Sequence, residues 1–187
     1  PDDEGQVSTS ITVRQSPAEA YQAWRRLDRL PEFMTHLESV VEGPNGTSHW
    51  VATAPAGQTV SWEAQIIDDQ PGERLEWRSL PGSEVSNHGR VTFREAPAGL
   101  GTEVTVSLEF QPPVVGRAGA FVARLFGEHP QQQVGDDLRR FKQMLETGEV
   151  LRSDGSPRGS RTIDLTTQHP AAPDVSAAVR NVREVSR

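Results

Sequence analysis

The chain contains no cysteine and one lysine among its 187 residues. Without cysteine the protein has no disulfide bonds, no zinc–thiolate site and no cysteine nucleophile. The other 18 basic residues are arginines, and the formal net charge is −7. Such a balance argues against the extended basic surface that nucleic acids and anionic membranes require. We therefore expect no nucleic-acid partner.

Long hydrophobic runs are also missing. The longest candidate, from Ala118 to Phe126, is interrupted by Gly119 and Arg124 and falls far short of the ~20 residues that cross a bilayer. Residues Pro1 to Gln6 are acidic and lack the basic start and apolar stretch of a secretory signal. We expect a cytoplasmic protein with no integral membrane association.

Motifs for common cofactors and nucleophiles do not occur. The sequence has no GxSxG, no glycine-rich phosphate loop and no dinucleotide fingerprint. Its five histidines show no metal-ligand spacing, so we expect neither cofactor nor metal. Two pairs of adjacent acids, Asp68-Asp69 on a predicted turn and Asp136-Asp137 on a predicted helix, are interpreted as solvated side chains.

The first elements are recognisable from local patterns. Apolar and polar residues alternate from Val7 to Val13, as in a half-buried strand. The segment Ser16 to Glu19 has the form of a capping box with proline at the first helical position, which predicts a helix that buries Tyr21 and Trp24. Pro31 is expected to start a second short helical turn.

A run of short strands follows between Glu38 and Gln111. Six β-type segments succeed one another there, each separated from the next by a compact turn rich in glycine, proline or asparagine. The alternation is clearest from Val60 to Ile66 and from Val104 to Phe110. Turn signals at this spacing favour an antiparallel sheet.

The period becomes helical after this run. Apolar residues of the last predicted helix recur at intervals of four, three and four, at Val134, Leu138, Phe141 and Leu145. An earlier apolar stripe spans residues 121–126, Pro130 predicts a break between the two stripes, and Gly148 is a natural C-cap. We predict an α+β domain in which a curved antiparallel sheet of about seven strands wraps on a long C-terminal helix.

The end of the chain differs in composition. Residues 150–187 are dominated by serine, glycine, proline, arginine and threonine, and they show no dense apolar pattern. We therefore predict one domain over residues 1–149 and a mobile polar tail over 150–187. A short helix near 174–185 is an alternative for part of this tail.

Four short phrases within this frame resemble a known family. They are LPEFM from Leu30, LEWRS from Leu75, GRVTF from Gly89 and DLRRFK from Asp137. In their order and spacing, over about three-quarters of the chain, they are similar to the bacterial cyclase/dehydrase branch of the START-like (SRPBCC) polyketide cyclase/dehydrase superfamily. The resemblance implies the helix-grip fold, with a cavity between the sheet and the long helix. Its members include aromatases, lipid and quinone carriers and other binding proteins, so function stays open.

The strand alternation directs three tryptophans toward the predicted helix. A flat apolar ligand could be held between these indoles and the helix; alternatively, the rings simply fill a close-packed core. If the cavity exists, we expect ligand contacts from Trp50, Trp62, Trp77, Ser79, Asn87, Val91, Phe93, Val106, Leu108, Phe121, Leu125 and Phe126.

Catalytic candidates are few. Glu128, at the expected helix break, could act as a base, and His36 lies after the second short helix. The ordinary interpretation is a helix-end carboxylate for the first and a structural histidine for the second. Aromatases of the superfamily use polar pocket residues that include tyrosine, and the single tyrosine, Tyr21, matches no pocket position. We therefore expect no evident catalytic set.

Three hypotheses about function follow. The first is binding or carriage of a small hydrophobic, aromatic or lipid-like molecule. The second is an enzyme of the cyclase, aromatase or dehydratase type that acts on a polyketide-like substrate. The third is a partner-binding module, with a homodimer or another protein held through residues 150–187 or through the long helix.

Overall fold

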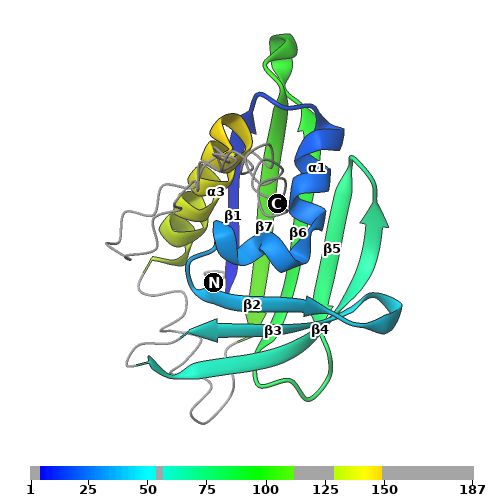
Figure 1. Cartoon of the computed structure of the whole chain (residues 1–187), viewed down its shortest axis with the longest axis vertical. Coiled ribbons are helices and arrows are strands. Elements are labelled where there is room, and N and C mark those ends of the chain that lie inside the picture. Colours follow the sequence, from blue (N-terminus) through cyan, green and yellow to red (C-terminus); the bar gives the residue numbers. More distant parts are fainter. Residues whose placement is uncertain (1–4, 54–56, 112–128, 149–187) are drawn as a thin grey trace, which may run out of the picture. The chain divides into compact units, whose positions relative to one another are not determined.

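The computed structural model describes residues 5–53, 57–111 and 129–148 (Figure 1). Predictions for the apolar stripe at 121–126, for Glu128 and for the tail at 150–187 lie outside these residues. The helices are α1 (Pro17–Arg25), α3 (Pro130–Thr147) and the 3-10 helices η1 (Leu27–Glu32), η2 (Pro44–Gly46) and η4 (Pro97–Gly99). The strands are β1 (Gln6–Val13), β2 (Leu37–Glu42), β3 (Thr47–Thr53), β4 (Thr59–Gln70), β5 (Arg74–Ser79), β6 (Ser86–Glu95) and β7 (Thr102–Gln111).

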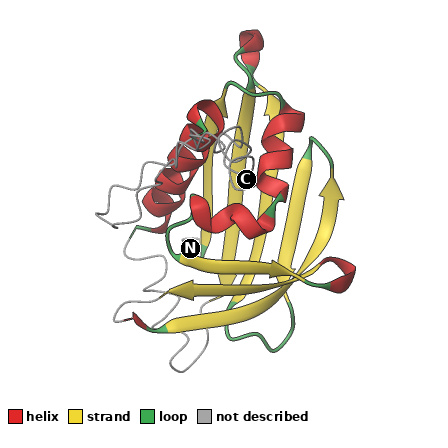
Figure 2. Ribbon diagram, viewed as in Figure 1, coloured by secondary structure: helices red, strands yellow, loops and turns green. Residues whose placement is uncertain are grey.

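The strands form a single seven-stranded sheet in the order β1-β7-β6-β5-β4-β3-β2. All neighbouring strands are antiparallel, and the last strand, β7, lies beside the first, β1. The sheet curls into a half-barrel, and α1, η1 and α3 lie on its concave side (Figure 2). The predicted α+β helix-grip fold is therefore confirmed.

Two irregularities help to bend the sheet. The pairing register shifts between Leu37 and Ser39 on β2 and between Ile66 and Asp68 on β4, as at a β-bulge. The bulge in β4 leaves Ile67 46% exposed and lets the strand continue to Gln70. The prediction that Asp68 and Asp69 lie on a turn is wrong, because both are within this extended strand.

Two of the predicted helix ends are confirmed and one is wrong. Ser16 Oγ accepts from the Glu19 amide at 3.3 Å, and the Ser16 amide donates to the Glu19 carboxylate at 2.9 Å, so the capping box is confirmed. Gly148 adopts a left-handed conformation and its N–H donates to the Met144 carbonyl. The prediction for Pro31 is wrong: η1 begins at Leu27 and contains the proline near its end.

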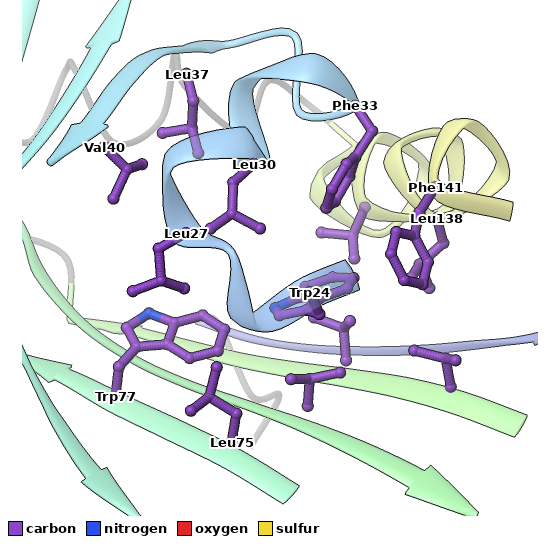
Figure 3. Packing of buried hydrophobic residues seen from close by; sticks show 14 of the residues in the cluster. Trp24, Leu27, Leu30, Phe33, Leu37, Val40, Leu75, Trp77, Leu138 and Phe141 are labelled. Carbon is purple, nitrogen blue, oxygen red and sulfur yellow. The ribbon is translucent and has the colours of Figure 1, made fainter. Parts of the chain in front are cut away.

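An aromatic cluster joins the helices over the sheet. Phe141 of α3 packs against Trp24 of α1 and against Phe33, with ring centroids 5.0 Å from each, and Trp24 lies 5.2 Å from Phe33 (Figure 3). Trp24, Phe33 and Phe141 are almost fully buried, as is Leu138 one helical turn before Phe141. The apolar face of α3 therefore covers the sheet as its spacing predicts.

Truncation of Phe141 tests this packing. We expect Phe141→Ala to lower the free energy of unfolding by about 3–5 kcal/mol, because it leaves a cavity against Trp24 and Phe33. Urea unfolding measures the change. Leu100→Ala is the control, since Leu100 is 65% exposed and its truncation should cost less than about 0.5 kcal/mol. Equal effects of the two substitutions would contradict the observed arrangement of α3.

Candidate functional site

Three tryptophans form a stacked layer on the concave face. Trp50, Trp62 and Trp77 come from the neighbouring strands β3, β4 and β5, and all three are more than 90% buried. The centroid of Trp50 lies 5.8 Å from that of Trp62 and 6.1 Å from that of Trp77, with interplanar angles of 21° and 17°. The layer presents indole surface to the space between sheet and helices.

A glycine on β6 makes room for this layer. Gly89 pairs with Trp77 across β5 and β6. A Cβ atom at Gly89 would lie 2.1 Å from Cζ2 of the Trp77 indole, so any larger residue would displace the ring. The bare backbone of β6 thus lets the indole of Trp77 lie flat across it.

A cavity opens between the tryptophan layer and α3. Its sheet wall includes the three stacked tryptophans together with Val106 and Leu108 of β7, and its other wall includes Trp24, Val134 and Leu138. The space is about 690 Å³ with its opening to solvent, of which about 60 Å³ is open to the centre of a water molecule. Because one buried water needs roughly 10–15 Å³ by that measure, the interior has room for a few water-sized groups.

The predicted ligand-binding residues divide into three groups. Those that line the cavity are Trp50, Trp62, Trp77, Asn87, Val106 and Leu108. Three are buried elsewhere in the core: Val91, Phe93 and Ser79, of which Phe93 packs edge-on against Tyr21 and Ser79 binds the Asn87 backbone. The remaining ones, Phe121, Leu125 and Phe126, lie outside the described residues, as does Glu128.

The cavity wall contains two titratable residues, and only one of them was a candidate from the sequence. His36 lines the cavity, and so does Asp137, whose side chain is 6% exposed. The prediction that Asp137 faces solvent is wrong. Its position three residues after Val134 and one before Leu138 places it beside the apolar face of α3, and that spacing was the available signal.

Each member of the pair has defined neighbours. The Oδ1 atom of Asp137 accepts from Arg140 at 2.8 Å, and its Oδ2 atom lies 3.7 Å from Nδ1 of His36. The same Nδ1 atom is 2.9 Å from the side-chain amide nitrogen of Gln133. An amide nitrogen donates, so this contact identifies Nδ1 as an acceptor and the imidazole as neutral.

Burial shifts both acid–base equilibria toward the neutral forms. It raises the pKa of Asp137 to about 7, although Arg140 and the backbone amide of Thr35 favour the carboxylate. Burial, with a smaller contribution from the charge of Arg140, lowers the pKa of His36 to about 4. The contact between His36 and Asp137 is therefore not an ion pair near pH 7, despite its short distance.

Two indole N–H groups in the cavity wall have no acceptor. The Nε1 atoms of Trp24 and Trp62 are buried without a hydrogen-bond partner within the described part of the chain. Trp50 differs, because its Nε1 donates to Ser48 Oγ at 2.8 Å. A buried donor without an acceptor is costly, so these two indoles are exceptions to the usual pairing of buried polar groups.

Across 5–53, 57–111 and 129–148, no group of three or more histidine, aspartate or glutamate side chains is arranged to hold a metal ion. Within the same ranges, no helix has the length and hydropathy needed to cross a bilayer.

Comparison with known proteins identifies the family. The sequence model of the family described as "Polyketide cyclase / dehydrase and lipid transport" matches residues 13–139, and the chain belongs to this family. A 17.2 kDa protein of Streptomyces lincolnensis, in the melC2-rnhH intergenic region, is 31% identical over 144 residues, which cover 75% of this chain and 89% of the relative.

Solved structures share the fold. The protein DR_A0006 of Deinococcus radiodurans is 42% identical, with a TM-score of 0.65 over 78% of this chain and all of that one. TTHA0849 of Thermus thermophilus is 24% identical, with a TM-score of 0.56 over 75% and 96% of the two chains. The Zhui aromatase/cyclase of Streptomyces sp. R1128 is 13% identical, with a TM-score of 0.58 over 78% and 98%. At such identities the last two support the fold alone.

Substitution of Gly89 tests the support of the tryptophan layer. We expect Gly89→Ala to destabilise the protein by about 1–3 kcal/mol and to change the near-ultraviolet circular dichroism of its tryptophans, because the new methyl group collides with Trp77. Gly135→Ala on α3 is the matched control, since its Cβ would meet Thr9 at an ordinary 3.8 Å. An unchanged tryptophan signal in Gly89→Ala would contradict the placement of Trp77.

Opposite pH dependences are expected from the polar pair. The raised pKa of Asp137 gives stability that is present below its ordinary value of 3.8 and is lost as the pH rises through about 7. The lowered pKa of His36 gives stability that is present above 6.5 and is lost as the pH falls through about 4. In the native protein these two contributions largely cancel between pH 4 and pH 6.5.

Single substitutions separate the two contributions. Relative to the native protein, Asp137→Asn should lose stability more steeply as the pH falls from 6.5 to 4, because only the histidine contribution remains. His36→Gln should instead lose stability more steeply as the pH rises from 4 to 7. Urea unfolding at a series of pH values measures both trends. Three parallel profiles would show that neither group is perturbed by burial.

Proposed function

We propose that this protein binds a small, flat, apolar molecule of aromatic character in the cavity between the tryptophan layer and α3. The single observation that carries the proposal is the stacked arrangement of Trp50, Trp62 and Trp77 along one cavity wall. Indole faces offer a large area for offset stacking and for burial of apolar surface. A concave apolar site with few polar groups is the usual form of a small-molecule site.

The stacked indoles favour a flat ligand over a bulky one. Their rings are nearly parallel, so a planar ring can lie against the wall that they form. The polar groups at the cavity, His36, Asn87 and Asp137, are few enough to orient a ligand without offsetting the apolar contacts. Membership of a family described by both polyketide cyclisation and lipid transport is consistent with such a ligand.

An enzyme of the cyclase or dehydratase type is the second candidate. The observation in its favour is the pair of titratable side chains, His36 and Asp137, in a cavity whose other lining residues, apart from Asn87, are aromatic or aliphatic. A structural neighbour named as an aromatase/cyclase has the same fold, and the likeness extends to the fold alone. The third hypothesis, a partner held through residues 150–187 or through the long helix, stays a prediction.

A cavity-filling substitution tests ligand binding. Leu108 is partly buried at the cavity, so Leu108→Trp should occupy the ligand's space while the sheet stays intact. We expect native mass spectrometry of the unmodified protein, followed by organic extraction, to release an apolar aromatic compound that is absent from Leu108→Trp. Leu100→Trp is the matched control, because Leu100 is exposed away from the cavity-lining residues, and it should retain the compound.

Two outcomes would contradict the proposal. The first is equal recovery of the compound from Leu108→Trp and Leu100→Trp, which would locate the ligand elsewhere. The second is an unliganded protein whose tryptophan fluorescence does not respond to any flat aromatic compound; in that case the indoles serve only as packed core.

A further inference from the structure

We propose that the side-chain amide of Asn87 selects the ligands of the cavity, and that it favours flat aromatic lactams, cyclic amides that carry N–H and C=O side by side on one ring edge. The inference rests on the proposed function, since the lactam must first bind beside the tryptophan layer. It deepens that function by naming the chemical class of the ligand and the residue that recognises it.

Asn87 is exceptional among the buried polar residues of the described chain. Five polar or charged residues are buried in those ranges, and four of them have a hydrogen-bond partner for the side chain. The four pairs are Ser48 with Trp50, Ser79 with the backbone of Asn87, Thr102 with Gln15, and Asp137 with Arg140. The carboxamide of Asn87 makes no hydrogen bond within the described part of the chain, although the residue is only 9% exposed.

This carboxamide is open to the cavity. Asn87 lines the cavity wall, and neighbouring atoms do not seal its amide group as they seal the Nε1 atoms of Trp24 and Trp62. An amide that is buried without a partner has lost its hydrogen bonds to water. A ligand that replaces those bonds gains affinity, so the amide favours molecules with a matching polar group.

The hydroxyl group of Ser79 fixes the backbone that carries the amide. Ser79 Oγ accepts from the main-chain N–H of Asn87 at 2.9 Å and donates to the main-chain carbonyl of Asn87 at 3.3 Å. These bonds join β5 to β6 just beyond Arg78 and His88, the last residues that pair directly between the two strands. Both polar groups of the Asn87 main chain are therefore held, and the side chain keeps its place in the cavity wall.

The amide lies beside the tryptophan layer. Gly89, which pairs with Trp77 and supports its indole, is two residues from Asn87 on β6. Residues two apart on a strand point to the same face and are separated by roughly 7 Å along it. A ring that stacks on the indoles can therefore bring one of its edges to the Asn87 amide.

The chemistry of a carboxamide specifies the ligand. Its oxygen accepts a hydrogen bond and its nitrogen donates one. A lactam presents the complementary pair in the plane of its ring, so the two groups can form two parallel hydrogen bonds, as asparagine does with a base edge that has an adjacent donor and acceptor. A ketone or a lactone offers acceptors alone and leaves the Asn87 oxygen unpaired. An aromatic ring fused to the lactam supplies flat apolar surface for the indoles.

The two titratable residues of the cavity wall do not carry the same signal. His36 contacts the side-chain amide of Gln133 at 2.9 Å, and Asp137 accepts from Arg140 at 2.8 Å. Both side chains therefore have partners within the protein before any ligand binds. The unpartnered carboxamide of Asn87 is the group to which we assign selection.

The experiment compares two ligands of the same bicyclic shape by isothermal titration calorimetry of the full chain. They are 2-quinolone, a lactam, and coumarin, a lactone in which a ring oxygen replaces the N–H. We expect the native protein to bind 2-quinolone roughly tenfold more tightly, the effect of about one net hydrogen bond. Asn87→Leu should reduce this affinity ratio to about one, because leucine has neither donor nor acceptor. Thr92→Val is the matched control on the same strand; Thr92 does not line the cavity, so the ratio should persist.

Ser79 is a positioning residue in this scheme, and the same ratio tests it. Ser79→Ala should lower the ratio while the affinity for coumarin changes little, and Ser79→Thr, which keeps the hydroxyl group, should retain the preference for 2-quinolone. A merely structural role would weaken both ligands equally, so an unchanged ratio in Ser79→Ala would contradict the positioning role.

The affinity ratio distinguishes this inference from the proposed function. Equal affinities of the native protein for 2-quinolone and coumarin overturn the selection of lactams and leave the binding of flat aromatic molecules intact. A preference for 2-quinolone that survives in Asn87→Leu overturns the role of Asn87. Absence of binding of both compounds to the native protein contradicts the inference and the proposed function together. The comparison in the native protein needs no variant, so poor folding of Asn87→Leu does not remove the test.

Discussion

The contact of Phe141 with Trp24 and Phe33 is the packing interaction on which the cavity depends. A curved sheet has a concave face that its own strands cannot cover. The helices α1 and η1, which follow each other in the sequence, and α3, from the other end of the domain, must be held over that face. The three rings, with centroids 5.0–5.2 Å apart, tie these parts together. The cavity lies beside this cluster, between α3 and the tryptophan layer, and Trp24 belongs to both the cluster and the cavity wall.

The same arrangement explains why polar groups remain inside. Desolvation of Asp137 and His36 opposes folding in the charged forms, and each group is retained by partners, Arg140 and Gln133 respectively. Apolar residues at both positions would close the cavity at less cost. Burial of these two groups therefore lowers the stability of the fold. Costs of this kind, and groups with shifted pKa values, are more common at functional sites than elsewhere in proteins.

Much of the fold could be predicted from local patterns. The capping box at Ser16, the strand alternation and the C-cap at Gly148 depend on interactions within a few residues, so they are visible in the sequence. The bulge after Ile66 could not be predicted, because it is decided by pairing with β5. The environment of Asp137 was misjudged for a related reason: the residue lies at the edge of an apolar helix face, and the segment that carries His36 buries it.

The candidate site was predictable in its apolar part and hidden in its polar part. Strand alternation places tryptophans on one face. It cannot show that Trp50 finds Ser48 as an acceptor, whereas Trp24 and Trp62 find none in the described part of the chain. That difference depends on tertiary neighbours. An unpaired buried donor is costly, and strand alternation contains no information on whether such a donor finds an acceptor.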